Sequence, residues 1–221
     1  MNKTDNILKR KVDLTKYWVY CVRGNHEERP ENLFGMEEIY DENVKNTVYY
    51  ETAFPRIRYL KDGEVYYFGE YKTLVIGGAY SVDKWHRLSK AKPNDNWTGW
   101  FKDEQLTAEE MSHIEEKYKN QTFDFVLTHT CPFSWQPTDL FLNTIDSSSV
   151  DYEMEFWLEK IKKSINWDIW LFGHYHDDRF VRPKVEMFFT DINNLDDIYF
   201  RWHMENLEPF GFKDPNYNEE I

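Results

Sequence analysis

The middle of the chain alternates helix patterns with short apolar strands, and this alternation limits the possible folds more than any other feature. Thr107-Ala108-Glu109-Glu110 is a capping box, which predicts a surface helix running to Lys119. A strand is predicted next, at residues 123–128. From Asp151, apolar residues recur at helical spacing, and a strand at residues 167–172 follows. The apolar residues of that helix are Met154, Trp157, Leu158, Ile161 and Ile165. Helices that alternate with short buried strands are typical of an α/β domain.

More strands are predicted on either side of this alternation. Residues 17–22 form a β-branched and aromatic run that stops at Gly24. Residues 56–60 and 65–68 flank Asp62-Gly63 and predict a hairpin. The remaining predicted strands are residues 72–76, 185–190 and 198–202. Because residues 209–221 are polar and rich in Pro and Asn, we expect one domain over residues 1–205 and a polar tail over residues 206–221.

Composition and charge exclude several classes of protein. The 221 residues include 27 Lys and Arg against 40 Asp and Glu, and this net charge of −13 argues against a broad surface for DNA or RNA. No apolar run approaches the ~20 residues of a membrane helix, and the first residues lack the pattern of a signal peptide. Cys21 and Cys131 are expected to be reduced rather than part of a disulfide framework. We therefore expect a cytoplasmic protein with no membrane partner.

Histidines follow three of the predicted strands. Gly24-Asn25-His26-Glu27 follows the first strand, His129 follows residues 123–128, and Gly173-His174-Tyr175-His176 follows residues 167–172. Ligands bind at the carboxyl ends of strands in open α/β sheets, so these loops are expected to converge on one site. Imidazole nitrogens and the Asn side-chain oxygen are good ligands for divalent first-row metals. The alternative is a set of loop histidines that are hydrogen-bonded within the protein and hold no metal.

Five segments together resemble the calcineurin-like metallophosphoesterases, especially the small bacterial and phage members. They are GNHEERP (24–30), GGAYSVDKWHRL (77–88), DEQLTAEE (103–110), LTHTCP (127–132) and FGHYH (172–176). The resemblance implies an α/β, four-layer sandwich of two mixed β-sheets flanked by helices. It also implies hydrolysis of phosphomonoesters or phosphodiesters at a dinuclear metal site.

The resemblance assigns roles to individual residues. Asn25, His129 and His174 match the ligands of one metal ion, and His176 matches a ligand of the other. His26 matches a catalytic histidine that contacts the scissile phosphate and can protonate the leaving oxygen. In such sites two ions, here Mn, Fe or Zn, hold a hydroxide for in-line attack and neutralise charge on the phosphoryl oxygens.

The family pattern is incomplete upstream of Gly24. Family members carry a D-x-H motif and then a GD motif before GNH, whereas residues 1–23 contain neither. The first two strand–loop units are therefore expected to be missing, together with carboxylates that hold the ions. Two divalent ions about 4 Å apart repel by about 17 kcal/mol at an effective dielectric of 20. One ion at Asn25, His129 and His174 is thus more plausible than two.

This departure leaves two functions open. The chain is either an active metallophosphoesterase, or a catalytically impaired remnant or half-domain that binds at most one metal ion and needs a partner chain. Missing strands would also leave a strand edge exposed, so self-association is expected.

Several other residues near these motifs have two possible roles. Arg23, Arg29 and Arg87 either contact phosphate, for which guanidinium is well suited, or lie solvated on the surface. Arg29 and Arg87 are kept as candidate substrate-binding residues. The aromatic-rich segment 85–101 either covers the site or packs beneath a long loop. Cys131 is not expected to act as a nucleophile, because residues 132–137 include no Arg to cradle a phosphate.

Overall fold

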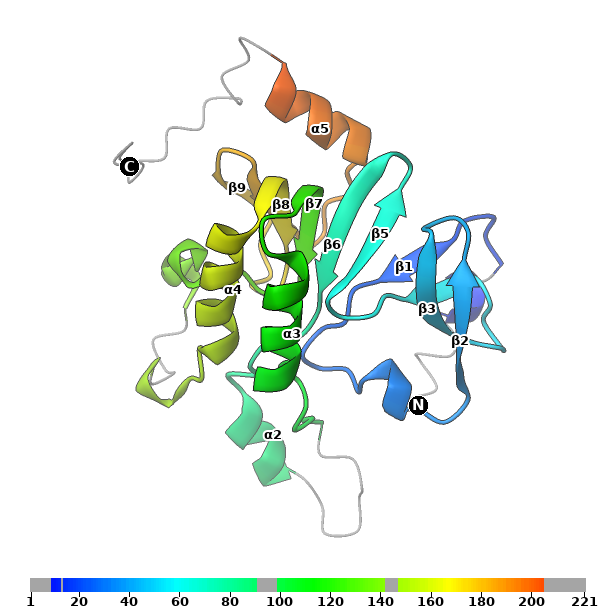
Figure 1. The fold of residues 1–221 in the computed structure, drawn as a ribbon. Helices are drawn as coiled ribbons and strands as arrows, with labels where there is room; N and C mark the ends of the chain where they lie inside the picture. Colours follow the sequence, from blue (N-terminus) through cyan, green and yellow to red (C-terminus); the bar gives the residue numbers. More distant parts are fainter. Residues whose placement is uncertain (1–8, 13, 91–98, 142–146, 205–221) are drawn as a thin grey trace.

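The computed structural model describes residues 9–12, 14–90, 99–141 and 147–204, which form two mixed β-sheets with helices around them (Figure 1). The smaller sheet has the order β1 (Val19–Cys21), β4 (Ile57–Tyr59), β3 (Asn46–Glu51) and β2 (Met36–Asp41). The larger sheet has the order β5 (Glu64–Phe68), β6 (Tyr71–Ile76), β7 (Thr122–Thr128), β8 (Asn166–Phe172), β10 (Val185–Met187) and β9 (Arg179–Arg182). Strands β6, β7, β8 and β10 run parallel, whereas β5 and β9 pair antiparallel at the edges.

The described helices are α2 (Lys84–Lys90), α3 (Ala108–Tyr118), α4 (Glu153–Ser164) and α5 (Leu195–His203), and residues 9–12 are also helical. Short 3-10 turns lie at Pro30–Asn32, Phe133–Trp135, Thr138–Leu140 and Ser147–Ser149. Within this described part of the chain, no helix is long and apolar enough to cross a membrane.

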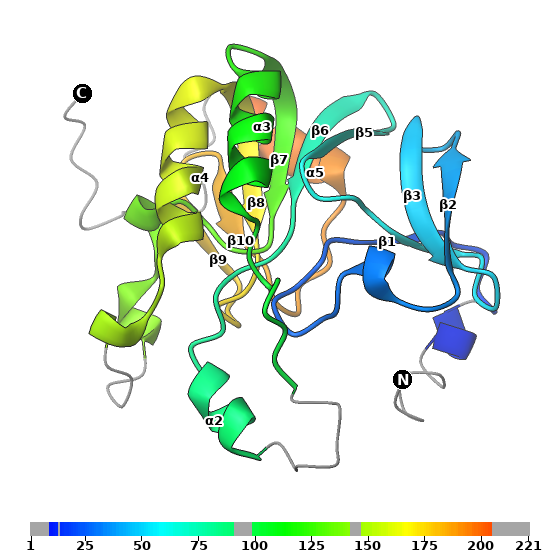
Figure 2. The ribbon, with the colours of Figure 1, turned by 60° about the horizontal axis from the view of Figure 1, so that its bottom comes forward.

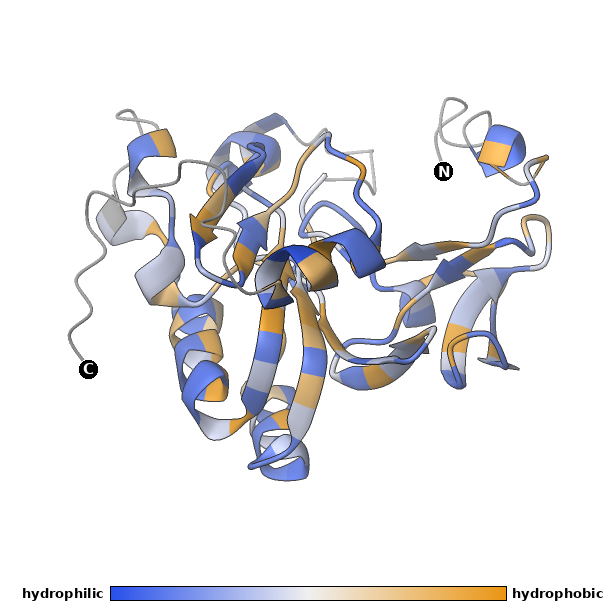
Figure 3. Ribbon diagram, turned by 90° about the horizontal axis from the view of Figure 1, so that it is seen from above, coloured by the Kyte–Doolittle hydropathy of each residue, from blue (hydrophilic) through white to orange (hydrophobic). Residues whose placement is uncertain are grey.

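Helices α3 and α4 cover one face of the larger sheet (Figure 2). Helix α3 begins at the predicted capping box: the Thr107 hydroxyl accepts a hydrogen bond from the Glu110 amide at 3.2 Å, and the Glu110 carboxylate accepts one from the Thr107 amide at 2.7 Å. Helix α4 buries the apolar side chains whose spacing predicted it. Figure 3 shows hydrophobic and hydrophilic residues alternating along these helices, as expected when one face packs on a sheet.

The other face of the larger sheet is shared between α5 and the smaller sheet. Ile198 of α5 packs with Phe125 and Ile169, whereas Val48 of the smaller sheet packs with Tyr66 and Val75 of the larger one. The helical turn at residues 9–12 lies against the smaller sheet, where Lys9 forms an ion pair with Glu51 of β3 at 2.5 Å. Helices, two mixed sheets and this turn form the layers of the predicted α/β sandwich.

The hairpin predicted around Asp62-Gly63 is wrong. Strand β4 pairs with β1 and β3, whereas β5 pairs with β6 in the other sheet. The turn itself is present, and Gly63 adopts a positive φ of 72°. The Asp62 carboxylate accepts hydrogen bonds from Arg23 Nε and from the Gly77 amide, each at 2.7 Å. These long-range contacts hold the turn between the sheets, so the strands that leave it diverge.

The strand predicted at residues 198–202 is also wrong, because this segment belongs to helix α5. The Asn194 side chain caps the helix by accepting a hydrogen bond from the Asp196 amide at 2.9 Å. Leu195, Ile198, Tyr199 and Trp202 pack on the larger sheet. Their helical spacing becomes visible only when the sequence window is extended back to Leu195.

Smaller differences concern strand β10 and the hairpin of β2 and β3. Strand β10 ends at Met187 rather than at residue 190. The hairpin of β2 and β3, which pair antiparallel, was not predicted. The predicted tail at 206–221 lies outside the described residues.

Candidate metal and active site

Loops that follow β1, β6, β7 and β8 meet at one end of the larger sheet. The ends of β6, β7 and β8 lie together because these strands are parallel neighbours. Backbone hydrogen bonds then connect the loops: the Gly78 amide donates to Arg23 O at 2.8 Å, the His129 amide to Ile76 O at 3.0 Å, and the Gly173 amide to His129 O at 3.1 Å. The predicted convergence of the histidine loops is therefore present in the fold.

Three potential metal ligands converge at this point. His129 Nε2 lies 3.0 Å from Asn25 Oδ1 and 3.3 Å from His174 Nδ1. The two imidazole rings meet edge to face, with their centroids 5.0 Å apart. Gly24 lies beside the His129 ring, where a Cβ would make an ordinary van der Waals contact with Cε1 at 3.4 Å. An amide oxygen and two imidazoles are thus placed to face a common point.

The electrostatics of the site favour neutral imidazoles. Burial, and then the neighbouring His174 and Arg23, hold the pKa of His129 well below its usual value. Burial, and then His26 and His176, lower the pKa of His174 to about 4. Because a metal binds the unprotonated ring nitrogen, this environment keeps the two histidines in the ligating form at neutral pH.

Hydrogen bonds outside the ligand cluster orient the Asn25 amide. Asn25 is 4% exposed, and its Nδ2 donates to Ser81 Oγ at 2.9 Å. Ser81 is held in turn, because its amide donates to Glu104 Oε1 at 3.0 Å. Since Nδ2 is used by Ser81, the amide presents Oδ1 to the histidines. Neither Ser81 nor Glu104 was predicted to have a role, although they lie in the quoted segments 77–88 and 103–110.

These donors fit one divalent ion. Oxygen and imidazole nitrogen ligands suit Mn, Fe and Zn. Within the described residues, no group of three or more His, Cys, Asp and Glu side chains could hold a metal ion, so the set depends on the Asn25 amide. His176, predicted for a second ion, is exposed and its ring stacks on Phe189 with centroids 4.9 Å apart. The second ion stays a prediction.

A family model described as calcineurin-like phosphoesterase matches residues 2–178. The chain belongs to this family. No curated protein and no solved structure matches the chain. The family match agrees with the resemblance seen in the five motifs. Four of these motifs, at 24–30, 77–88, 127–132 and 172–176, lie at the converging loops. The expectation that the first strand–loop units are missing stays a prediction.

His26, the predicted catalytic residue, lies beside helix α2. Its Nε2 is 3.1 Å from Arg87 Nη2. Burial, and then the charge of Arg87, lower the pKa of His26. Arg87 is thus placed at the candidate catalytic residue. Its predicted contact with substrate stays a prediction.

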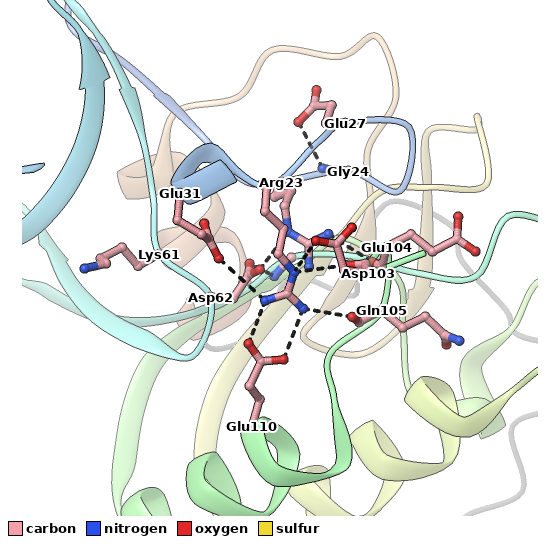
Figure 4. Close-up of polar contacts among 12 residues, drawn as sticks. Arg23, Gly24, Glu27, Glu31, Lys61, Asp62, Asp103, Glu104, Gln105 and Glu110 are labelled. Carbon is pink, nitrogen blue, oxygen red and sulfur yellow. Dashed lines mark hydrogen bonds and ion pairs between the residues drawn. The ribbon is translucent and has the colours of Figure 1, made fainter. Parts of the chain in front are cut away.

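Arg29 and Arg23 are not solvated surface arginines. Arg29 binds both carboxylate oxygens of Glu110, at 2.6 and 3.1 Å, and donates to the Asp103 and Gln105 carbonyls. Arg23 is 3% exposed and donates to Asp62 and to Glu104 O (Figure 4). Both guanidiniums therefore join the loops beneath the site. Substrate binding by Arg29 stays a prediction, and these contacts give it a structural role.

Polar side chains connect the loop that carries His129 with the loop that carries His174 and with helix α4. Thr130 Oγ1 donates to Glu155 Oε1 at 2.9 Å and lies 3.1 Å from Tyr175 Oη. No pattern in the sequence singled out Glu155, since it lies beside the apolar residues of α4.

Both cysteines are free thiols: Cys131 is buried and Cys21 is partly buried. Burial raises the pKa of the Cys131 thiol, which disfavours the thiolate that a nucleophile needs.

The aromatic-rich segment 85–101 is described only in part, because residues 91–98 lie outside the described residues. Trp85 is 65% exposed on α2. The Gly99 carbonyl accepts a hydrogen bond from Arg87 Nη1 at 3.0 Å. This end of the segment therefore lies next to the residue that contacts His26.

Proposed function

We propose that the chain hydrolyses phosphate esters, either phosphomonoesters or phosphodiesters, with divalent metal held by Asn25, His129 and His174. The observation that carries this proposal is the convergence of Asn25 Oδ1, His129 Nε2 and His174 Nδ1 within 3.0 and 3.3 Å contacts. Mn, Fe and Zn all suit these ligands. In the dinuclear form of the proposal, His176 contributes to a second ion. When bound, such ions lower the pKa of coordinated water and offset charge on the phosphoryl oxygens.

The chain's own residues then have distinct roles. His26 donates a hydrogen bond or a proton toward the leaving oxygen. Ser81 keeps the Asn25 oxygen directed at the histidines. Arg23 and Asp62 hold the loop of Gly24 against the loop after β6, so that the ligands from two sheets stay in register.

A second candidate function is a chain that binds one ion and acts only when another chain completes it. It is favoured by the donor set, because the described residues bring together ligands for one ion. Metal stoichiometry separates the two: turnover with two bound ions per chain supports the dinuclear enzyme. One bound ion without turnover supports the second candidate.

The proposed activity is tested by hydrolysis of a generic aryl phosphate ester with added Mn²⁺. We compare the wild type with a His129→Ala, His174→Ala double variant and with His113→Ala, whose side chain is exposed on α3. The proposal predicts metal-dependent turnover in the wild type and in His113→Ala, and loss of turnover in the double variant. Turnover that survives in the double variant, or its absence from folded wild type, contradicts the proposal.

A further inference from the structure

Arg87 is fixed on three sides at the edge of the site. Its Nε donates to Asp83 Oδ2 at 2.7 Å, four residues earlier and directly before α2. Its Nη1 donates to the Gly99 carbonyl at 3.0 Å, and its Nη2 lies 3.1 Å from His26 Nε2. The guanidinium is therefore oriented by groups other than His26, and it faces that ring in a defined geometry.

The chemistry of this contact determines where the imidazole hydrogen lies. A guanidinium is always protonated in proteins and has five N–H donors and no acceptor. Its partner nitrogen must therefore be an acceptor, which means that His26 Nε2 carries a lone pair and no hydrogen. In a neutral ring the hydrogen is then on Nδ1.

We infer that Arg87 is a positioning residue that fixes His26 in the tautomer with its hydrogen on Nδ1. The catalytic meaning of this inference rests on the proposed function, whereas the tautomer itself does not. With Nε2 occupied, His26 has one ring nitrogen left for a ligand, and that nitrogen is a donor. It suits an acceptor such as a phosphoryl oxygen or the leaving oxygen of an ester.

This role differs from a simple phosphate clamp. A clamp would bind the substrate through the guanidinium itself, and its removal would raise KM while leaving the His26 ring unchanged. A positioning residue acts through His26. Its removal lets the hydrogen move to Nε2, and the loss falls mainly on kcat.

The tautomer can be read by long-range ¹H–¹⁵N NMR of the full chain, both metal-free and loaded with Zn²⁺. The His26 signals are assigned by their disappearance in His26→Gln. We expect an unprotonated Nε2 and a protonated Nδ1 in the wild type. Arg87→Ala should move the pattern toward hydrogen on Nε2, and Arg87→Lys, which keeps a cationic donor, should restore part of the wild-type pattern. Lys90→Ala removes an exposed charge from the same helix and should change nothing.

The wild-type spectrum alone can overturn the inference, because hydrogen on His26 Nε2 is incompatible with it. An Arg87→Ala spectrum identical to that of the wild type, with α2 resonances retained, would also contradict it. In turnover, we expect Arg87→Ala to reduce kcat about tenfold or more with a smaller change in KM. If the wild type shows the expected tautomer but no turnover, the proposed function fails and the tautomer assignment stands.

Discussion

The candidate metal site depends on the side-chain amide of Asn25, which a hydrogen bond to the Ser81 hydroxyl holds in place. Asn25 can ligate a cation only through Oδ1, and the hydrogen bond from Nδ2 to Ser81 fixes which end of the amide faces the histidines. The Ser81 backbone amide donates to the buried Glu104 carboxylate, which holds Ser81 in place. Glu104 therefore helps, through Ser81, to orient the candidate ligand Asn25. Partners of this kind affect metal affinity although they never touch the ion.

Ser81→Ala should therefore lower the affinity for a divalent ion about tenfold, because the Asn25 amide is no longer held with Oδ1 inward. Isothermal titration with Zn²⁺ measures the effect. Ser164→Ala, at the end of α4, serves as the control, since that hydroxyl donates to the Ile161 carbonyl of the same helix. Equal affinities for Ser81→Ala and the wild type would show that the hydrogen bond does not orient the amide.

Glu155 gives a pH prediction. Burial raises the pKa of Glu155 to about 7, above the value of 4.5 expected in the unfolded chain. Between those values the native state binds more protons, so this group makes the free energy of unfolding decrease as pH rises from about 4.5 to 7. The loss is at most about 3 kcal/mol.

Glu155→Gln removes the titration and keeps an oxygen for Thr130. Relative to the wild type, the variant should be near neutral at pH 5 and more stable at pH 8 in urea unfolding. Glu153→Gln, exposed on the same helix, should show no such pH dependence. If Glu155→Gln has the same relative stability at both pH values, Glu155 does not titrate in this range.

At the element scale, helix α5 shows how far local sequence can determine structure. A strand would place Ile198, Phe200 and Trp202 on one face, whereas the helix separates Ile198 from Phe200. In the structure Ile198 is 2% exposed and Phe200 is 59% exposed. Two interactions favour the helix over the strand: the Asn194 cap, and the packing of the helix on the face of β7 and β8.

Ile198→Ala should thus destabilise the protein by about 3 kcal/mol, because a buried side chain is lost from a packed face. Phe200→Ala should change stability by about 0.5 kcal/mol or less, because its ring is largely in water. Urea unfolding of both variants is the measurement. Similar losses for the two would support the strand rather than the helix.

Other elements could be predicted where the residues that determine them lie close together in the sequence. The capping box at Thr107 and the spaced apolar residues of α4 act within a few residues, and both helices were predicted from them. The hairpin prediction failed because Asp62 bonds to Arg23 and Gly77, which are distant in sequence. The candidate ligands were predicted by resemblance, whereas Ser81 and Glu155 contact partners that no local pattern reveals.

At the scale of the whole molecule, the smaller sheet has edges that the described residues leave unpaired. Strands β1 and β2 are the outer strands, and no described strand pairs with their outer sides. Strand β2 carries Glu37 and Glu38, which discourage edge pairing. Tyr17, just before β1, is 76% exposed. We propose that self-association, if it uses a strand edge, uses β1.

Light scattering coupled to size-exclusion chromatography should show a mass that rises with protein concentration. Tyr17→Lys should weaken this association, because a charge beside an edge strand opposes pairing. Phe34→Lys, at another exposed aromatic residue, is the control. A monomer at every concentration would contradict the prediction.

Asn25, His129 and His174 are proposed to hold one divalent ion. The most direct measurement is an anomalous difference map from crystals of the wild-type chain grown with Zn²⁺. We expect a peak at ligand distance, about 2.0–2.2 Å, from Asn25 Oδ1 and from both imidazoles. A map with no peak there, or with zinc bound only elsewhere on the chain, would contradict it.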